Sequence, residues 1–199
     1  MLPSRAYSDP LPATATIPAA PTTESLPVLL LAVNAGDAER FNVSRFTRLL
    51  AHSTADVLRT LERTKPRIVT VDLDGPEFDA VAICNAAAQT GCTSVLASTA
   101  SPERVPPVIK AGCHGVLLKP FSPAILASRL GRLMRDPLPT LAARHAAGVT
   151  VAGTNRTWPD TACPTCDQPG AVSFEFSSYR RMWYACLGCE AVWLGPRRE

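Results

Sequence analysis

The chain is organised around the run Pro66-Arg67-Ile68-Val69-Thr70-Val71-Asp72-Leu73-Asp74-Gly75-Pro76. Its first half is apolar and β-branched, and its second half consists of acids and turn residues. An apolar run of this length, bounded by Pro and Gly, is typical of a buried strand in a parallel sheet. Asp72 then lies at the carboxyl end of the strand, where open α/β sheets bind their ligands. Its carboxylate either reacts or binds a metal there, or it starts a turn or caps the next helix.

Length and composition predict one domain of ordinary size with something smaller attached. The chain has 199 residues, and its hydrophobic fraction of 46% is sufficient for a core. The net charge of +3 is too small to indicate nucleic-acid binding by itself. No apolar run approaches the roughly 20 residues of a membrane span, and the N-terminus lacks the pattern of a secretory signal. We therefore expect a cytoplasmic, thiol-reducing environment.

Strand-like and helix-like segments alternate between residues 27 and 136. Strands are expected at 28–33, 66–72, 93–98 and 115–118, and a short second strand at about 47–51. Helices are expected at 37–43, after the cap at Ser53, at 77–90, after Ser101-Pro102, and from Ser122 to Arg135. Because an interior proline costs about 3 kcal/mol, Pro106 and Pro107 should shorten or kink the fourth helix, or delay it to about Val108. This alternation predicts an α/β fold with a five-stranded, doubly wound parallel sheet.

Residues 27–136 resemble the response-regulator receiver domain, which has a flavodoxin-like fold. The likeness rests on Asp72 with Pro76 four residues later, the pairs Phe78-Asp79 and Ala111-Gly112, and Lys119-Pro120-Phe121. The resemblance implies that Asp72 is the phosphoacceptor, that Lys119 contacts the phosphoryl group, and that the Lys119–Pro120 peptide is cis. It also implies a partner such as a histidine kinase. In the family, Mg²⁺ offsets the negative charge of the carboxylate that attacks the phosphoryl group.

Several positions depart from the family's pattern. The acidic pair that holds Mg²⁺ falls on Val33 and Asn34, and of these only Asn34 offers an oxygen. Asp74 is a second candidate ligand for the cation, whereas Asp37 is expected to lie too far out. The cation site therefore looks poor, and binding of Mg²⁺ is doubtful.

The residues that couple phosphorylation to the surface in the family are also altered. The switch hydroxyl aligns with Ala97 or, after a shift, with Ser98 or Thr99 as a phosphate contact, and the aromatic of the fifth strand falls on Val116. Two versions of the receiver hypothesis follow. In one, Asp72 is phosphorylated despite poor Mg²⁺ affinity. In the other, the domain is a pseudo-receiver that acts as a binding module, and the loss of two metal carboxylates favours this version.

Four cysteines near the C-terminus form two C-x-x-C pairs with nineteen residues between them: Cys163, Cys166, Cys186 and Cys189. Two such pairs predict a tetrahedral Zn²⁺ site with no open position, which makes the metal structural rather than catalytic. Residues 172–176 and 181–184 should form a hairpin. The segment resembles a zinc ribbon of the general-transcription-factor type, and metal binding would supply most of its folding energy. A redox dithiol is the alternative.

These segments predict four parts: a disordered Pro/Ala/Thr-rich leader at 1–26, a receiver-like domain at 27–136, a linker at 137–160, and a zinc ribbon at 161–199. A short Ala-rich helix is expected within the linker at 141–147. The function that fits them is an atypical response regulator of a phosphorelay, which is not an enzyme and uses the ribbon as an output or interaction module.

A second function uses the ribbon differently. Arg180, Arg181 and Trp183 are candidates for contacting nucleic acid, because basic and aromatic side chains together bind single strands. The chain would then be a transcription-associated protein whose ribbon contacts nucleic acid or polymerase, with the receiver kept for docking. The simpler interpretation is that the aromatics pack the ribbon's small core and the arginines are solvated.

Overall fold

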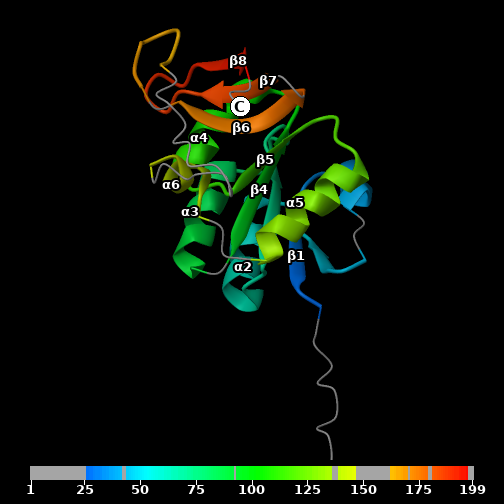
Figure 1. The fold of residues 1–199 in the computed structure, drawn as a ribbon. Helices are drawn as coiled ribbons and strands as arrows, with labels where there is room; N and C mark the ends of the chain where they lie inside the picture. Colours follow the sequence, from blue (N-terminus) through cyan, green and yellow to red (C-terminus); the bar gives the residue numbers. More distant parts are fainter. Residues whose placement is uncertain are drawn as a thin grey trace, which may run out of the picture.

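A computed structural model describes residues 26–41, 44–91, 93–135, 139–146, 162–169, 171–178 and 181–196 (Figure 1). The described residues form a five-stranded sheet surrounded by helices and a separate three-stranded sheet near the C-terminus. Within these ranges, no helix is both long and apolar enough to span a bilayer.

The larger sheet is parallel throughout and has the strand order β2-β1-β3-β4-β5. Its strands are β1 Val28–Ala32, β2 Thr47–Leu50, β3 Ile68–Asp72, β4 Ser94–Thr99 and β5 Gly115–Leu118. The order confirms the predicted doubly wound sheet. It places β3 in the centre, so Asp72 lies between the ends of β1 and β4.

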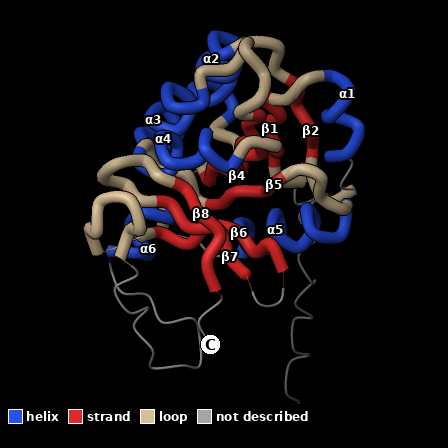
Figure 2. Tube along the Cα trace, turned by 90° about the horizontal axis from the view of Figure 1, so that it is seen from above, coloured by secondary structure: helices blue, strands red, loops and turns tan. Residues whose placement is uncertain are grey.

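Helices cover both faces of this sheet (Figures 1 and 2). They are α1 Ala35–Ala38, α2 Thr54–Thr64, α3 Ala80–Thr90, α4 Val105–Lys110 and α5 Pro123–Arg135. Successive strand residues point to opposite faces. Val69 and Val71 therefore share one core cluster with α2, α3 and α4, while Ile68 shares the other with α5.

Local signals explain where the helices begin and end. The side chain of Ser53 accepts a hydrogen bond from the Asp56 backbone N–H and caps α2, and Asp79 caps α3 in the same way. Gly91 ends α3 with φ of 67°, a left-handed conformation that favours glycine. The predicted start of α3 at residue 77 was three residues early, because Asp79 is the cap.

The prediction for the first helix was wrong in detail. It is a single turn, Ala35–Ala38, followed by a 3₁₀ turn at Glu39–Phe41, rather than a helix from Asp37 to about Val43. The fourth helix is short, as one of the predicted alternatives had it: its 6 residues begin at Val105 after a 3₁₀ turn at Pro102–Arg104, and it is not delayed to Val108. Pro106 and Pro107 fall in its first turn, where backbone N–H groups have no intrahelical acceptor to lose.

The C-terminal part contains α6 Leu141–Ala146 and an antiparallel sheet of β6 Val172–Ser178, β7 Arg181–Ala185 and β8 Val192–Pro196. The sheet extends the predicted hairpin by a third strand. The backbone N–H of Leu141 donates to the Cys113 carbonyl over 2.8 Å, which ties α6 to the receiver-like domain. Figures 1 and 2 both place β6 beside β5.

Candidate functional site

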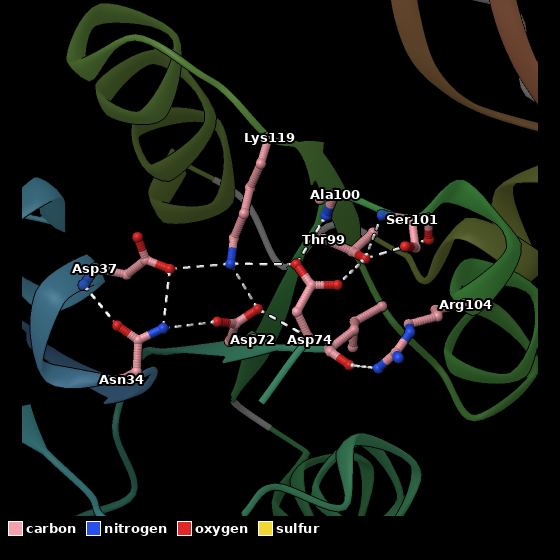
Figure 3. A network of polar contacts seen from close by, with 10 residues as sticks. Asn34, Asp37, Asp72, Asp74, Thr99, Ala100, Ser101, Arg104 and Lys119 are labelled. Atoms are coloured by element: carbon pink, nitrogen blue, oxygen red, sulfur yellow. Dashed lines mark hydrogen bonds and ion pairs between the residues drawn. The ribbon is translucent and has the colours of Figure 1, made fainter. Parts of the chain in front are cut away.

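A cluster of charged side chains lies at the carboxyl ends of the parallel strands (Figure 3). Asp72 ends β3 and is 1% exposed, and Lys119 directly follows β5. The Lys119 ammonium nitrogen is 2.8 Å from Asp72 Oδ1, 2.9 Å from Asp37 Oδ2 and 3.3 Å from Asp74 Oδ2. One ammonium group is thus bound by three carboxylates, which come from α1, from the end of β3 and from the loop that follows β3.

The carboxylate of Asp74 has further donors from the end of β4. The Thr99 hydroxyl donates to its Oδ1 over 2.6 Å, and the Ala100 backbone N–H donates to its Oδ2 over 2.8 Å. Its own backbone N–H donates to Asp72 Oδ1 over 3.1 Å. Asp74 therefore joins the ends of β3, β4 and β5 in a single network.

This network shifts two pKa values away from their ordinary range. Partial burial raises the pKa of Asp74, but the hydrogen bonds from Thr99, Ala100 and Lys119 outweigh it and hold the pKa below 3.8. Burial lowers the pKa of Lys119, but the hydrogen bonds and charges of Asp72 and Asp37 outweigh it and hold the pKa above 10.5. Both groups are therefore ionised at neutral pH.

The structure brings most of the predicted site residues together. Asp72, Lys119, Asp74 and Thr99 belong to the network, and the Lys119–Pro120 peptide is cis as the resemblance implied. Ser98 pairs in register with Asp72 on the neighbouring strand, and its buried Oγ has no hydrogen-bond partner among the described residues. Their predicted roles toward a phosphoryl group stay predictions.

The expectation for Asp37 was wrong, because this residue contacts Lys119. Asn34 caps α1 through a 2.8 Å hydrogen bond that its Oδ1 accepts from the Asp37 backbone N–H. This cap holds Asp37 at the carboxyl ends of the strands, where its side chain contacts Lys119. The spacing Asn34-x-x-Asp37 is itself a helix-start signal, and it was the one clue in the sequence to this placement.

The oxygen-rich donor set could in principle suit Mg²⁺, which prefers carboxylate oxygens. The contacts indicate a different arrangement. The Asn34 Oδ1 is used in the helix cap, and its Nδ2 faces Asp72 at 3.4 Å and Asp37 at 3.2 Å. Asn34 thus presents N–H groups to the carboxylates rather than a metal-binding oxygen. In the described ranges, four cysteines form a group whose donor atoms converge as a metal ion requires.

The four predicted cysteine ligands converge on one point, with all four sulfurs within 4.8 Å of one another. Cys163 Sγ is 3.6 Å from Cys189 Sγ, and Cys166 Sγ is 3.7 Å from Cys186 Sγ. A tetrahedron with Zn–S bonds of about 2.3 Å places its sulfurs about 3.8 Å apart. The donor set therefore fits a Zn²⁺ ion, and all four positions are filled by protein.

The environment of Cys163 favours the thiolate that a metal requires. Desolvation opposes ionisation, but the backbone N–H groups of Thr165 and Cys166 donate to the sulfur and bring its pKa to about 6. Outside this cluster, Cys84 and Cys113 are fully buried in the core, and Cys92 lies outside the described residues.

Two of the three candidates for nucleic-acid contact lie on described residues of the ribbon. Arg181 is exposed on β7, and Trp183 packs partly against the core that the ribbon shares with the receiver-like domain. On the opposite face, Tyr184 and Trp193 stack with ring centroids 5.7 Å apart. Arg180 lies outside the described residues. The role of these side chains in nucleic-acid binding stays a prediction.

Comparisons with known proteins give the fold its name. No protein-family model matches the sequence, and no curated protein matches it. Among solved structures, the chain is similar to the receiver domain of a sensor histidine kinase from Pseudomonas aeruginosa PAO1, whose active-site cleft holds a magnesium ion. That match has 20% identity, covers 56% of this chain and 100% of the other, and has a TM-score of 0.51.

Two further matches are a response regulator from Thermotoga maritima and a chemotaxis response regulator from Vibrio cholerae. The first has 19% identity, covers 56% of this chain and 100% of the other, and has a TM-score of 0.48. The second has 21% identity, covers 54% and 97%, and has a TM-score of 0.46. The five-stranded domain is thus a flavodoxin-like α/β domain. More specifically, its fold is that of the response-regulator receiver domain, and a small ribbon with a four-cysteine cluster follows it.

Proposed function

We propose that this chain is an atypical response regulator whose receiver domain is a pseudo-receiver. In this proposal the domain binds a signalling protein, such as a histidine kinase, and does not switch by phosphorylation of Asp72. The ribbon holds a structural Zn²⁺ and serves as the interaction module. The observation that carries the proposal is that the donors around Asp72 already bind the chain's own carboxylate, that of Asp74.

Asp74 already uses donors that a phosphoryl group on Asp72 would need. The resemblance assigns Lys119 to the phosphoryl group and leaves Ser98 or Thr99 as its hydroxyl contact. Lys119 and Thr99 both contact Asp74, at 3.3 Å and 2.6 Å. A phosphoryl group on Asp72 would need these same donors. It would also bring a charge of about −1.5 to −2 next to two further carboxylates. Asp74 therefore competes with the phosphoryl group from a fixed position in the same network.

Lys119 takes the role that a bound cation has in a receiver site. When bound in a receiver site, Mg²⁺ neutralises the charge that develops during phosphoryl transfer. Here the Lys119 ammonium and the Asn34 amide are the positive partners of Asp72 and Asp37. One ammonium does not balance three carboxylates, so a divalent cation would still be attracted, but it would have to displace Lys119. We infer that Lys119 acts as a permanent internal cation.

The proposal also includes that the chain is not an enzyme and that it works in the cytoplasm. A site closed by its own side chains positions no nucleophile for repeated catalysis, so we propose a binding protein and not an enzyme. We place it in the cytoplasm, because a four-thiolate metal site requires reduced cysteines. The described cysteines are all free thiols.

The proposal is tested by adding beryllofluoride and Mg²⁺ to the full chain and recording amide NMR shifts. We expect no shifts centred on Asp72, Thr99 and Lys119 at millimolar Mg²⁺, and no added phosphate in the intact mass after incubation with a small phosphodonor. Shifts or a mass increase in the wild-type chain that disappear in Asp72→Asn would overturn the pseudo-receiver.

The Asp74→Ala variant isolates the observation that carries the proposal. Removing the carboxylate takes away the acceptor of the Thr99 hydroxyl and the Ala100 N–H and leaves Lys119 with two carboxylates instead of three. Beryllofluoride should then produce shifts at these residues. If Asp74→Ala stays as silent as the wild type, Asp74 is not what closes the site. Asp56→Ala is a matched control, because it removes a carboxylate on α2 that lies outside the network.

A further inference from the structure

The three-stranded sheet of the ribbon has two apolar faces, and one of them is shared with the receiver domain. Val172, Phe174 and Ala185 are buried in the same continuous core cluster as α4 and the strands of the larger sheet. Met182 and Tyr184 point the other way and form a small cluster of their own with Ala171 and Trp193. The face that carries Phe174, called here the inner face, therefore completes the receiver core beside β5 and α6.

The loop that supplies two metal ligands also makes contacts of this interface. This docking loop, Cys186–Glu190, contains Leu187, which packs against the shared core cluster. At the end of the docking loop, Glu190 forms an ion pair with Lys110, the last residue of α4. Glu190 Oε1 lies 2.6 Å from the Lys110 ammonium nitrogen. Cys186 and Cys189 flank the contacting residue Leu187 on either side.

Two backbone hydrogen bonds close the docking loop. The Cys186 N–H donates to the Ala191 carbonyl over 2.9 Å, and the Glu190 N–H donates to the Cys186 carbonyl over 3.0 Å. Glu190 itself has φ of 63°, an uncommon conformation for a residue with a side chain. A module of this size has little core, so a metal held by the four thiolates would supply much of the free energy that keeps the loop in this shape.

We propose that metal binding at the four cysteines controls access to the α4–β5 surface of the receiver domain. With the metal bound, the docking loop and the inner face cover that surface. Without it, the loop loses its shape, the inner face separates, and the α4–β5 surface becomes accessible. This proposal does not depend on whether Asp72 is phosphorylated, since it rests on the interface alone.

The test is hydrogen exchange of the full chain, followed by mass spectrometry, before and after removal of zinc with a chelator. We expect amides of residues 105–118 to exchange at least about tenfold faster without the metal, and to recover when zinc is restored. Amides of α2, which lies on the side of α3 away from the ribbon, serve as the internal control and should change much less. Faster exchange confined to residues 162–196 would overturn the proposal.

Two variants separate uncovering of the surface from general damage to the ribbon. Phe174→Ala truncates the inner face, and Met182→Ala truncates the opposite face of the same small sheet. With zinc present, the first should accelerate exchange at 105–118 about tenfold, and the second should leave those amides near the wild-type rate. Equal rates at 105–118 in the two variants would contradict a cover formed by the inner face.

Discussion

At the scale of the residue, Lys119 supplies the positive charge that the carboxylates of the site require. Its ammonium contacts three carboxylates, of which Asp72 is almost completely buried. A buried carboxylate requires a charged or hydrogen-bonding partner, because it has lost its contact with water. Lys119 is therefore a structural requirement of this edge of the sheet as well as a functional candidate.

Replacing Lys119 by Ala should lower the free energy of unfolding by about 3 kcal/mol, because Asp72 would stay buried without its cation. Urea unfolding at neutral pH measures the change. Lys110→Ala is the matched control: it removes an ion pair whose side chains are 39% and 51% exposed, and it should lower stability by less than about 1 kcal/mol. Equal losses in the two variants would contradict the role assigned to Lys119.

The lowered pKa of Asp74 predicts how the free energy of unfolding depends on pH. Because its folded-state pKa lies below 3.8, the ionised carboxylate stabilises the folded state above that pH. The contribution is lost as the pH falls below 3.8 through the folded-state pKa. Asp74→Ala should therefore be less stable than the wild type by about 1.5 kcal/mol at pH 7, and this difference should shrink toward about pH 2. Urea midpoints across this range measure it, and a difference independent of pH would count against the network.

At the scale of the element, short-range signals set the helix boundaries. Ser53, Asp79 and Asn34 each cap a helix through a side-chain oxygen. The two prolines of α4 fit for the same reason, since the first turn has unpaired N–H groups in any case. Of these three caps, Asn34 also belongs to the site, because it binds the Asp37 backbone and contacts Asp72.

Ser53→Ala should lower the free energy of unfolding by about 1 kcal/mol, because the Asp56 backbone N–H loses its side-chain acceptor. Thermal or urea unfolding followed by circular dichroism measures it. Ser128→Ala, at an exposed position within α5, should be neutral or slightly stabilising because Ala is the better helix former. A neutral Ser53→Ala variant would show that this cap contributes little.

At the scale of the whole molecule, the ribbon and the receiver domain share one core. Val172, Phe174 and Ala185 come from the ribbon, and Leu141 comes from α6, yet all four belong to the larger cluster of the receiver domain. Burial of apolar surface across the two sheets links their stabilities. The chain should therefore unfold as one unit while the metal is bound.

The distribution of tryptophan makes this cooperativity measurable. All three tryptophans, Trp158, Trp183 and Trp193, lie C-terminal to the receiver domain, whereas most of the helix lies within it. Tryptophan fluorescence therefore reports on the C-terminal part, and far-UV circular dichroism reports mainly on the receiver domain. With zinc bound the two unfolding curves should coincide, and after chelation the fluorescence transition should come first. Separate transitions in the zinc-loaded chain would show two independent units.

Much of this architecture is encoded in local patterns. Apolar runs predicted four of the five strands of the larger sheet, and the positions of Asp72 and Lys119 at strand ends followed from them. The short second strand was also predicted, although three of its four residues are exposed. The two C-x-x-C pairs predicted the sulfur cluster in the same way. Such patterns can be read from the sequence because strand burial, helix capping and metal ligation each depend on residues that are close together along the chain.

Other features depended on packing between distant segments. The contact of Asp37 with Lys119 joins residues 82 positions apart, and the hydrogen bond from Thr99 to Asp74 joins residues 25 apart. The docking of the ribbon's inner face on the α4–β5 surface has the same origin. These contacts form only after the strands have paired and their carboxyl ends have met. The sequence therefore predicted the candidate phosphoacceptor and the metal ligands. Only the tertiary structure decided that Asp74 contacts Lys119 and Thr99, and that the docking loop packs against the receiver domain.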